Sequence, residues 1–140
     1  MFTLKRFAVA SAAAVAMVVG IAGTASATEP QVDVWSSSNP DSCGYAGFAT
    51  NGDNFYFQDH CKDGHGVRVE YTTPTKGQPS TSDGKHTIDY TGGYTGFHWT
   101  SAANSNKDFA EGACFYFRAG LEESGTYIKG TYDVWHLACA

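Results

Sequence analysis

Eight consecutive residues, DHCKDGHG at 59–66, bring together two histidines, two aspartates and a cysteine. Such residue types can bind a metal, transfer a proton or form a tight turn. A structural zinc site needs four ligands, and the neighbouring Cys61 is expected to be oxidised in a disulfide. We therefore interpret the segment as a disulfide-braced turn in which Asp63 and Gly64 make the bend. His60 is expected to point outward, and we assign no metal and no cofactor.

Other candidate chemistry is sparse. The chain has no G-x-S-x-G, H-E-x-x-H or P-loop motif. His86, His98 and His136 can meet acids such as Asp89 or Asp133 across strands to form a general-base pair. That pairing would suit a small extracellular hydrolase, which we keep as an alternative. No catalytic residue is assigned, because five histidines and 14 acidic residues in one chain are expected to form some close pairs by chance.

The first 27 residues have the order of a secretory signal peptide. Lys5 and Arg6 precede an uncharged stretch over 7–22, and the small residues Ala25-Ser26-Ala27 follow it. A retained membrane anchor is the other interpretation of this stretch. We expect cleavage after Ala27 and a secreted, extracellular protein.

The remaining 113 residues are enough for one domain with a single core. Without Lys5 and Arg6 they carry 7 basic and 14 acidic side chains, a formal charge of −7 with neutral histidine. An acidic surface repels phosphate backbones and anionic lipid. The composition therefore disfavours nucleic acid as a partner, and a membrane after signal cleavage.

Four cysteines lie in the exported part, where the environment favours disulfides: Cys43, Cys61, Cys114 and Cys139. Two bridges are expected, and three pairings are possible. A zinc site made from the four cysteines is the alternative, although no C-x-x-C spacing is present.

Short aromatic and β-branched runs recur between turn-forming residues, which is typical of an all-β sandwich or barrel. Strands are expected near 31–37, 43–50, 54–61, 66–73, 86–91, 95–100, 113–119 and 126–138. Glu122-Glu123 is interpreted as solvated charge in a hairpin turn. We predict a single antiparallel β-sandwich of about eight strands with two disulfides.

The cysteine pairing follows from a hairpin around Asn51-Gly52-Asp53. A three-residue loop pairs Thr50 with Asn54 and places Cys43 opposite Cys61. Opposed Cβ atoms lie about 4.5–5.5 Å apart, close to disulfide geometry. We therefore predict the bridges Cys43–Cys61 and Cys114–Cys139.

This register also assigns the two faces of the hairpin. The expected core face carries Tyr45 and Gly47 against Phe55, Phe57 and Asp59, and Asp59 needs hydrogen-bond donors or an edge position there. A second hairpin, with Cys61 opposite Val67, is expected to bring 66–73 alongside 54–61, so that Val67, Val69 and Tyr71 join the same core.

The 18 aromatic residues after position 27 are too many for alternation to bury them all. Exposed rings on a rigid sheet suit a protein interface or sugar stacking. The candidate binding surface is Phe48, Tyr56, His60 and Trp35. An extracellular protein is the preferred partner; a glycan bound through Trp35, Trp99 or Trp135 is the alternative.

The segment 28–41 stands apart from the predicted domain at 42–140. It holds one β-prone run, QVDVW, bounded by Pro30 and Pro40. It is either the first strand of the domain or a detachable arm that adds to a partner's sheet edge.

Three stretches, CGYAGF, GDNFYFQDHCKDGHGVRVEY and FAEGACFYFRAG, resemble a family of small secreted actinobacterial β proteins. Its members share a Gly-Tyr-Ala-Phe-like strand, an Asp-x-x-x-Asp-Gly-His turn and a later Glu-Gly-x-x-x-x-Phe-Arg strand. The resemblance covers about 42–120 and implies a compact β fold and export, with no known activity. Cys61 departs from the family pattern. The sequence as a whole favours a secreted non-enzymatic binding protein, such as an accessory subunit of an extracellular assembly.

Overall fold

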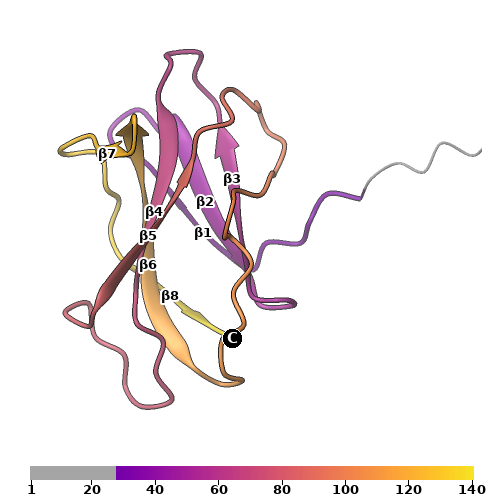
Figure 1. Cartoon of the computed structure of the whole chain (residues 1–140), viewed down its shortest axis with the longest axis vertical. Coiled ribbons are helices and arrows are strands. Elements are labelled where there is room, and N and C mark those ends of the chain that lie inside the picture. Colours follow the sequence, from indigo (N-terminus) through magenta and orange to yellow (C-terminus); the bar gives the residue numbers. More distant parts are fainter. Residues whose placement is uncertain (1–27) are drawn as a thin grey trace, which may run out of the picture.

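The computed structural model describes residues 28–140, and the predicted signal peptide, 1–27, lies outside the described residues. The described part forms two antiparallel sheets packed face to face (Figure 1). The predicted all-β sandwich is therefore confirmed. No helix in residues 28–140 is long and apolar enough to cross a membrane.

The first sheet has three strands in the order β1-β2-β3, and the second has five. The first holds β1 (Val34–Ser37), β2 (Gly44–Ala49) and β3 (Asn54–Asp59). The second holds β4 (Gly66–Thr72), β5 (Lys85–Tyr90), β6 (Cys114–Glu123), β7 (Thr126–Tyr127) and β8 (His136–Cys139). Its order is β5-β4-β6-β7, and β8 also pairs with β6.

Phenylalanine rings from both sheets form the centre of the core. Phe48 and Phe55 of the first sheet lie 5.1 Å apart, and Phe48 meets Phe115 of the second edge-on at 5.0 Å. The fully buried side chains include Phe57, Phe117, Val67 and Val69. Alternation along β4 predicts its inward residues Val67, Val69 and Tyr71 correctly, because this strand turns one face to the other sheet.

Both predicted disulfides are present. Cys43 and Cys61 are bridged with Cα atoms 5.1 Å apart, and Cys114 and Cys139 lie opposite each other on β6 and β8. Two bridges fit an oxidising environment.

The predicted register of the β2–β3 hairpin is wrong by one residue. Gly44 pairs with Asp59 and Ala49 with Asn54, so the loop has four residues, 50–53, in place of three. Gly52 and Asp53 both take positive φ, 90° and 48°. A shift of one residue turns the whole strand over. Phe48 therefore points into the core and Tyr45 points out, opposite to the prediction.

The second predicted hairpin does not form. β3 and β4 belong to different sheets, and DHCKDGHG carries the chain from one sheet to the other. The segment is a turn, as expected: Asp63 Oδ1 accepts the His65 amide at 3.0 Å. Val67, Val69 and Tyr71 still reach the core, but from the facing sheet.

Two further strand predictions are corrected. Residues 95–100 form a loop along the free edge of β3, and one isolated β-bridge, between Thr100 and Phe57, takes the place of a strand ladder. The predicted strand 126–138 divides into β7 and β8, because the chain turns at Gly130 (φ 88°) and then runs beside β6, where the Asp133 amide donates to the Ala119 carbonyl at 2.9 Å. There, the Tyr132 ring fills the space above Gly120.

Candidate functional site

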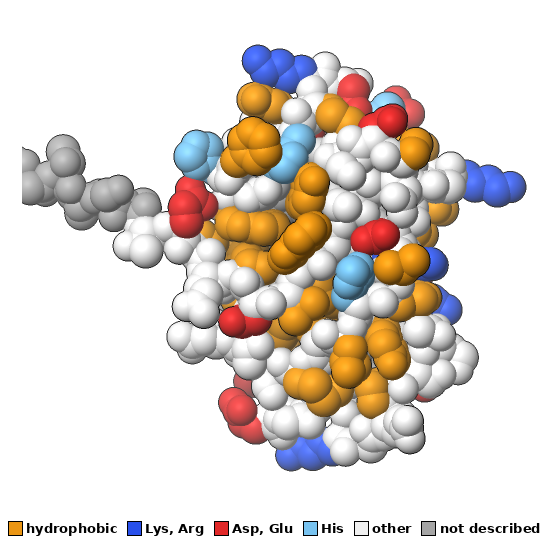
Figure 2. All heavy atoms as spheres, turned by 180° about the vertical axis from the view of Figure 1, so that it is seen from behind, with side chains coloured by type: hydrophobic (Ala, Val, Ile, Leu, Met, Phe, Trp, Pro, Cys, Tyr) orange, Lys and Arg blue, Asp and Glu red, His pale blue; other side chains and the backbone are white. Residues whose placement is uncertain are grey.

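Four rings follow one another across the outer face of the three-stranded sheet, and we call Trp35, Tyr45, His60 and Phe97 the aromatic strip. The ring centroids lie 5.8 Å apart for Trp35–Tyr45, 4.4 Å for Tyr45–His60 and 4.5 Å for His60–Phe97. Figure 2, which views the molecule from behind Figure 1, shows hydrophobic side chains spread over the middle of the view, with separate histidine side chains among and beside them.

The strip is assembled from three strands and one loop. Trp35 of β1 lies opposite Gly47, next to Tyr45 of β2, and His60 follows β3 directly. Gly47 is buried because Val32 and Trp99 occupy the space above it, where a Cβ atom would overlap Val32. A glycine in the middle strand thus lets an apolar layer lie flat on the sheet.

Hydrogen bonds fix the loop that carries Phe97. Gln58 donates from Nε2 to the Phe97 carbonyl at 2.9 Å, and the amides of Thr95 and Gly96 donate to the Asp59 carbonyl at 2.9 and 3.0 Å. The position of the Phe97 ring therefore follows from bonds to β3 and does not require a strand.

His60 is a neutral member of the strip. Burial lowers its pKa from 6.5, although the charge of Asp59 acts in the opposite direction. Its Nε2 lies 2.8 Å from Gln58 Oε1, and since Gln58 uses its amide nitrogen on Phe97, His60 donates this bond. The strip is thus uncharged at neutral pH.

The four residues of the predicted binding surface lie in different places in the structure. Trp35 is 56% exposed and His60 is half-buried within the strip. Tyr56 lies on the outer face opposite Gly47 and lines a separate hollow with Pro30. Phe48 as a surface residue is wrong: it is completely buried, because the register shift turns β2 over.

Sequence reasoning missed Tyr45 and Phe97. The predicted register places Tyr45 in the core, and the predicted strand 95–100 includes Phe97, which is 81% exposed. The run TGFHWT has the same β propensity as a strand, so only tertiary hydrogen bonds separate the two outcomes.

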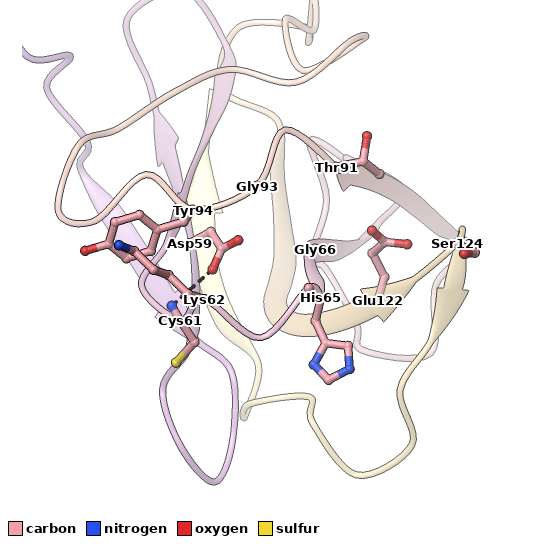
Figure 3. Close-up of a pocket in the computed structure, with 11 residues that line it drawn as sticks. Asp59, Cys61, Lys62, His65, Gly66, Thr91, Gly93, Tyr94, Glu122 and Ser124 are labelled. Atoms are coloured by element: carbon pink, nitrogen blue, oxygen red, sulfur yellow. Dashed lines mark hydrogen bonds between the residues drawn. The ribbon is translucent and has the colours of Figure 1, made fainter.

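A second surface feature is a pocket of about 310 Å³ between the 60–66 crossover, the 91–94 loop and the turn after β6 (Figure 3). Two carboxylates line it, Asp59 and Glu122, which are 3% and 2% exposed. Asp59 Oδ1 accepts the Cys61 amide at 3.1 Å, and Glu122 Oε2 accepts the Gly125 amide at 2.6 Å. Asp59 thus has the donor and the end-of-strand position that a core-side carboxylate needs.

Burial raises the pKa of Asp59 above its ordinary value of 3.8, and the charge of Asp63 adds to this; the Cys61 amide opposes it. Glu122 was expected to be a solvated turn charge, and this is wrong. Gly66, its neighbour across the sheet, has no side chain, and the Glu122 carboxylate occupies the vacated space. The lining of the pocket thus combines two buried carboxylates with Lys62.

Three histidines lie near acids. His136 Nε2 lies 3.0 Å from Asp133, His98 Nδ1 lies 2.7 Å from Glu29, and His65 Nδ1 lies 3.3 Å from Asp63. Of the three, only His65 lines the pocket with Asp59 and Glu122. The sequence suggests pairs such as His136 with Asp133. This pair is close, but it lies outside the pocket.

Two residues of DHCKDGHG, Cys61 and Asp63, belong to a cluster of metal-ligating residue types, and neither histidine of the segment does. Cys43, Cys61 and Asp63 lie within ligating distance of one another. Both sulfurs are in the disulfide, so neither is a thiolate ligand.

Together, these features define the class of protein as a two-layered all-β sandwich with two disulfides, an exposed aromatic strip and a small acidic pocket. Comparisons with protein-family models, with curated proteins and with solved structures find no match for this chain.

Proposed function

We propose that this chain is a secreted, non-enzymatic protein-binding module, an accessory subunit of an extracellular assembly, whose partner docks on the aromatic strip. The observation that carries the proposal is the exposure of the two end rings: Trp35 is 56% exposed and Phe97 81%. Large aromatic side chains on a rigid framework are typical anchors of protein interfaces, since they bury much area at little cost in side-chain entropy.

The relative orientation of the rings favours a protein over a glycan. Successive rings of the strip are tilted by 41°, 32° and 57°. They therefore present an uneven surface and not one plane against which consecutive sugar rings can stack. An uneven apolar surface fits side chains that interdigitate with it.

Export is supported by the leader-like order of residues 1–27 and by the two disulfides. The resemblance to small secreted actinobacterial proteins is in keeping with this proposal. The acidic surface favours a partner with basic residues around its apolar patch, because opposite charges speed association.

The test begins with recovery of the secreted protein and its associated molecules from culture fluid, followed by mass spectrometry. Three forms of the chain are then compared in their affinity for any recovered partner protein: wild type, the double variant W35A/F97A and L137A. Leu137 is a matched apolar control, 49% exposed and paired with Tyr116 in the second sheet. We expect the double variant to lose at least about tenfold in affinity, as interface anchors do, and L137A to bind as wild type.

Equal affinity of the double variant and wild type would exclude the strip as the docking surface. Quenching of tryptophan fluorescence by soluble glycans that is lost in W35A would instead support the glycan alternative.

A further inference from the structure

The second sheet ends in an open strand. Among the described residues, β5 pairs with β4 alone, and its other edge has no strand partner. Lys85, His86 and Thr87 at the start of β5 are exposed. In Figure 1, β5 crosses in front of β6.

The direction of the peptide groups in β5 follows from one hydrogen bond. The Thr73 amide donates to the Gly84 carbonyl at 2.6 Å, so Thr73 and Gly84 form a hydrogen-bonded pair. Such pairs alternate along an antiparallel ladder. His86, Ile88 and Tyr90 therefore turn their peptide groups toward β4, and Lys85, Thr87 and Asp89 turn theirs toward the open edge.

From this edge we infer that the protein forms a symmetric homodimer in which the β5 strands of two copies pair antiparallel, with Thr87 opposite Thr87 of the second copy. This register places Lys85 opposite Asp89 of the second copy, and Asp89 opposite its Lys85. All three residue pairs present outward peptide groups, so the two strands exchange about six hydrogen bonds.

The charges select this register among the neighbouring ones. A twofold axis at Lys85 or at Asp89 would place that residue opposite its own copy, so like charges would meet. An axis at His86 would place Lys85 opposite Thr87, and an axis at Ile88 would place Asp89 opposite Thr87, so neither charge would have a partner. Only the axis at Thr87 opposes Lys85 and Asp89 twice. Opposite charges directly across a sheet are favourable, and like charges are unfavourable. The interface is thus self-complementary, as a twofold dimer requires.

A neighbouring side chain holds one of the pairing residues, Asp89, in place. Asp89 accepts both Arg68 Nε and Arg68 Nη2 at 2.6 Å, which fixes its carboxylate on the outer face of the sheet. Lys85 and Asp89 are alternate residues of one strand and share that face. A lysine on an exposed edge also disfavours pairing with unrelated strands.

A β5–β5 dimer extends each five-stranded sheet into a continuous ten-stranded sheet. It leaves the first sheet of each copy, with its aromatic strip, outside the contact. The dimer does not depend on what the strip binds. It presents two strips, which strengthens binding to a partner with repeated sites.

The experiment is sedimentation equilibrium of the secreted protein over a range of concentrations. Wild type should reach twice the chain mass as concentration rises. Thr87→Pro should stay at the mass of one chain with an unchanged far-ultraviolet spectrum, because proline is tolerated on an edge strand where the N–H faces solvent. K85D should raise the dissociation constant about tenfold, since it replaces two attractive pairs by two repulsive ones. K129D, an exposed lysine outside β5, should behave as wild type.

If Thr87→Pro does not fold, hydrogen exchange of the wild-type protein tests the same interface. In wild type, the amide of Thr87 should exchange more slowly at dimeric than at monomeric concentration. A wild-type protein that keeps the mass of one chain at millimolar concentration would overturn the dimer. A dimer unaffected by K85D, or with a Thr87 amide equally exposed at all concentrations, would overturn this interface.

Discussion

The hydroxyl of Ser36 donates to the carboxylate of Asp133 at 3.1 Å, joining two residues 97 positions apart in the sequence. Asp133 also accepts from the Ser37 amide at 3.4 Å, from Asn39 Nδ2 at 3.1 Å and from His136 at 3.0 Å. Ser36 Oγ in turn accepts the Ala119 amide at 2.8 Å. The Asp133 carboxylate thus connects β1 to the segment between β7 and β8. Through Ser36, β1 is also connected to β6 of the facing sheet.

This arrangement predicts acid sensitivity. Burial alone would raise the pKa of Asp133, but the bonds from His136, Ser36 and the backbone bring it below 3.8. A lowered pKa contributes stability at pH values above 3.8, and that stability is lost as pH falls through the lowered value. We expect D133N to melt below wild type at neutral pH and the difference to shrink as the pH falls below 3.8. Thermal melting across this range checks it. A pH-independent difference would contradict the ionic role of Asp133.

Asp59 predicts the opposite sign. Its pKa is raised above 3.8 by burial, so the folded protein holds the proton more tightly than the unfolded chain and stability falls as pH rises past 3.8. D59N removes the cost of the buried charge and keeps the oxygen that accepts the Cys61 amide. We expect a higher melting temperature than wild type at pH 7 and no difference at about pH 2.5. Asp41→Asn, on the exposed surface, is the control and should leave the melting temperature unchanged.

Phe48 and Phe97 should respond very differently to truncation. Phe48 is completely buried against Phe55 and Phe115, so F48A should lower the free energy of unfolding by about 3–5 kcal/mol. Phe97 is 81% exposed, and F97A should change it by less than about 0.5 kcal/mol. Urea unfolding of both variants checks this. Equal losses would mean that β2 faces the other way.

Gly66 should tolerate no side chain. A Cβ there would overlap Glu122 Oε1 and the Tyr90 carbonyl, and the latter is backbone that cannot move aside easily. We expect Gly66→Ala to lower the free energy of unfolding by about 1–3 kcal/mol. Gly77→Ala is the matched control, because the nearest atom to its new methyl group is Thr75 Oγ1 at 3.4 Å. Denaturant unfolding of the pair should separate them clearly.

The sequence predicts the fold class, both disulfides and the inward residues of β4, because alternation and cysteine spacing are local signals. It does not determine whether the loop after Thr50 has three residues or four. Gly52 and Asp53 can both adopt positive φ, and the longer loop lets Phe48 join the other phenylalanines. The cysteines are still correctly paired, since Cys61 lies beyond the end of β3, next to the residue whose amide bonds to Cys43.

The candidate surface could be predicted only in part. Trp35 follows from simple alternation in an edge strand. Tyr45 depends on the register, and Phe97 depends on hydrogen bonds from Gln58 and to Asp59 that no local pattern encodes. The buried Glu122 depends on the absence of a side chain at Gly66, which is 56 positions away.

Asp59, His60 and Cys61 are consecutive, and each serves a different feature: the acidic pocket, the aromatic strip and the bridge to Cys43. A reductant that opens this bridge releases the short stretch of chain that holds one wall of the pocket and the centre of the strip. The two surfaces are therefore expected to lose their shape together when the protein moves from an oxidising to a reducing medium.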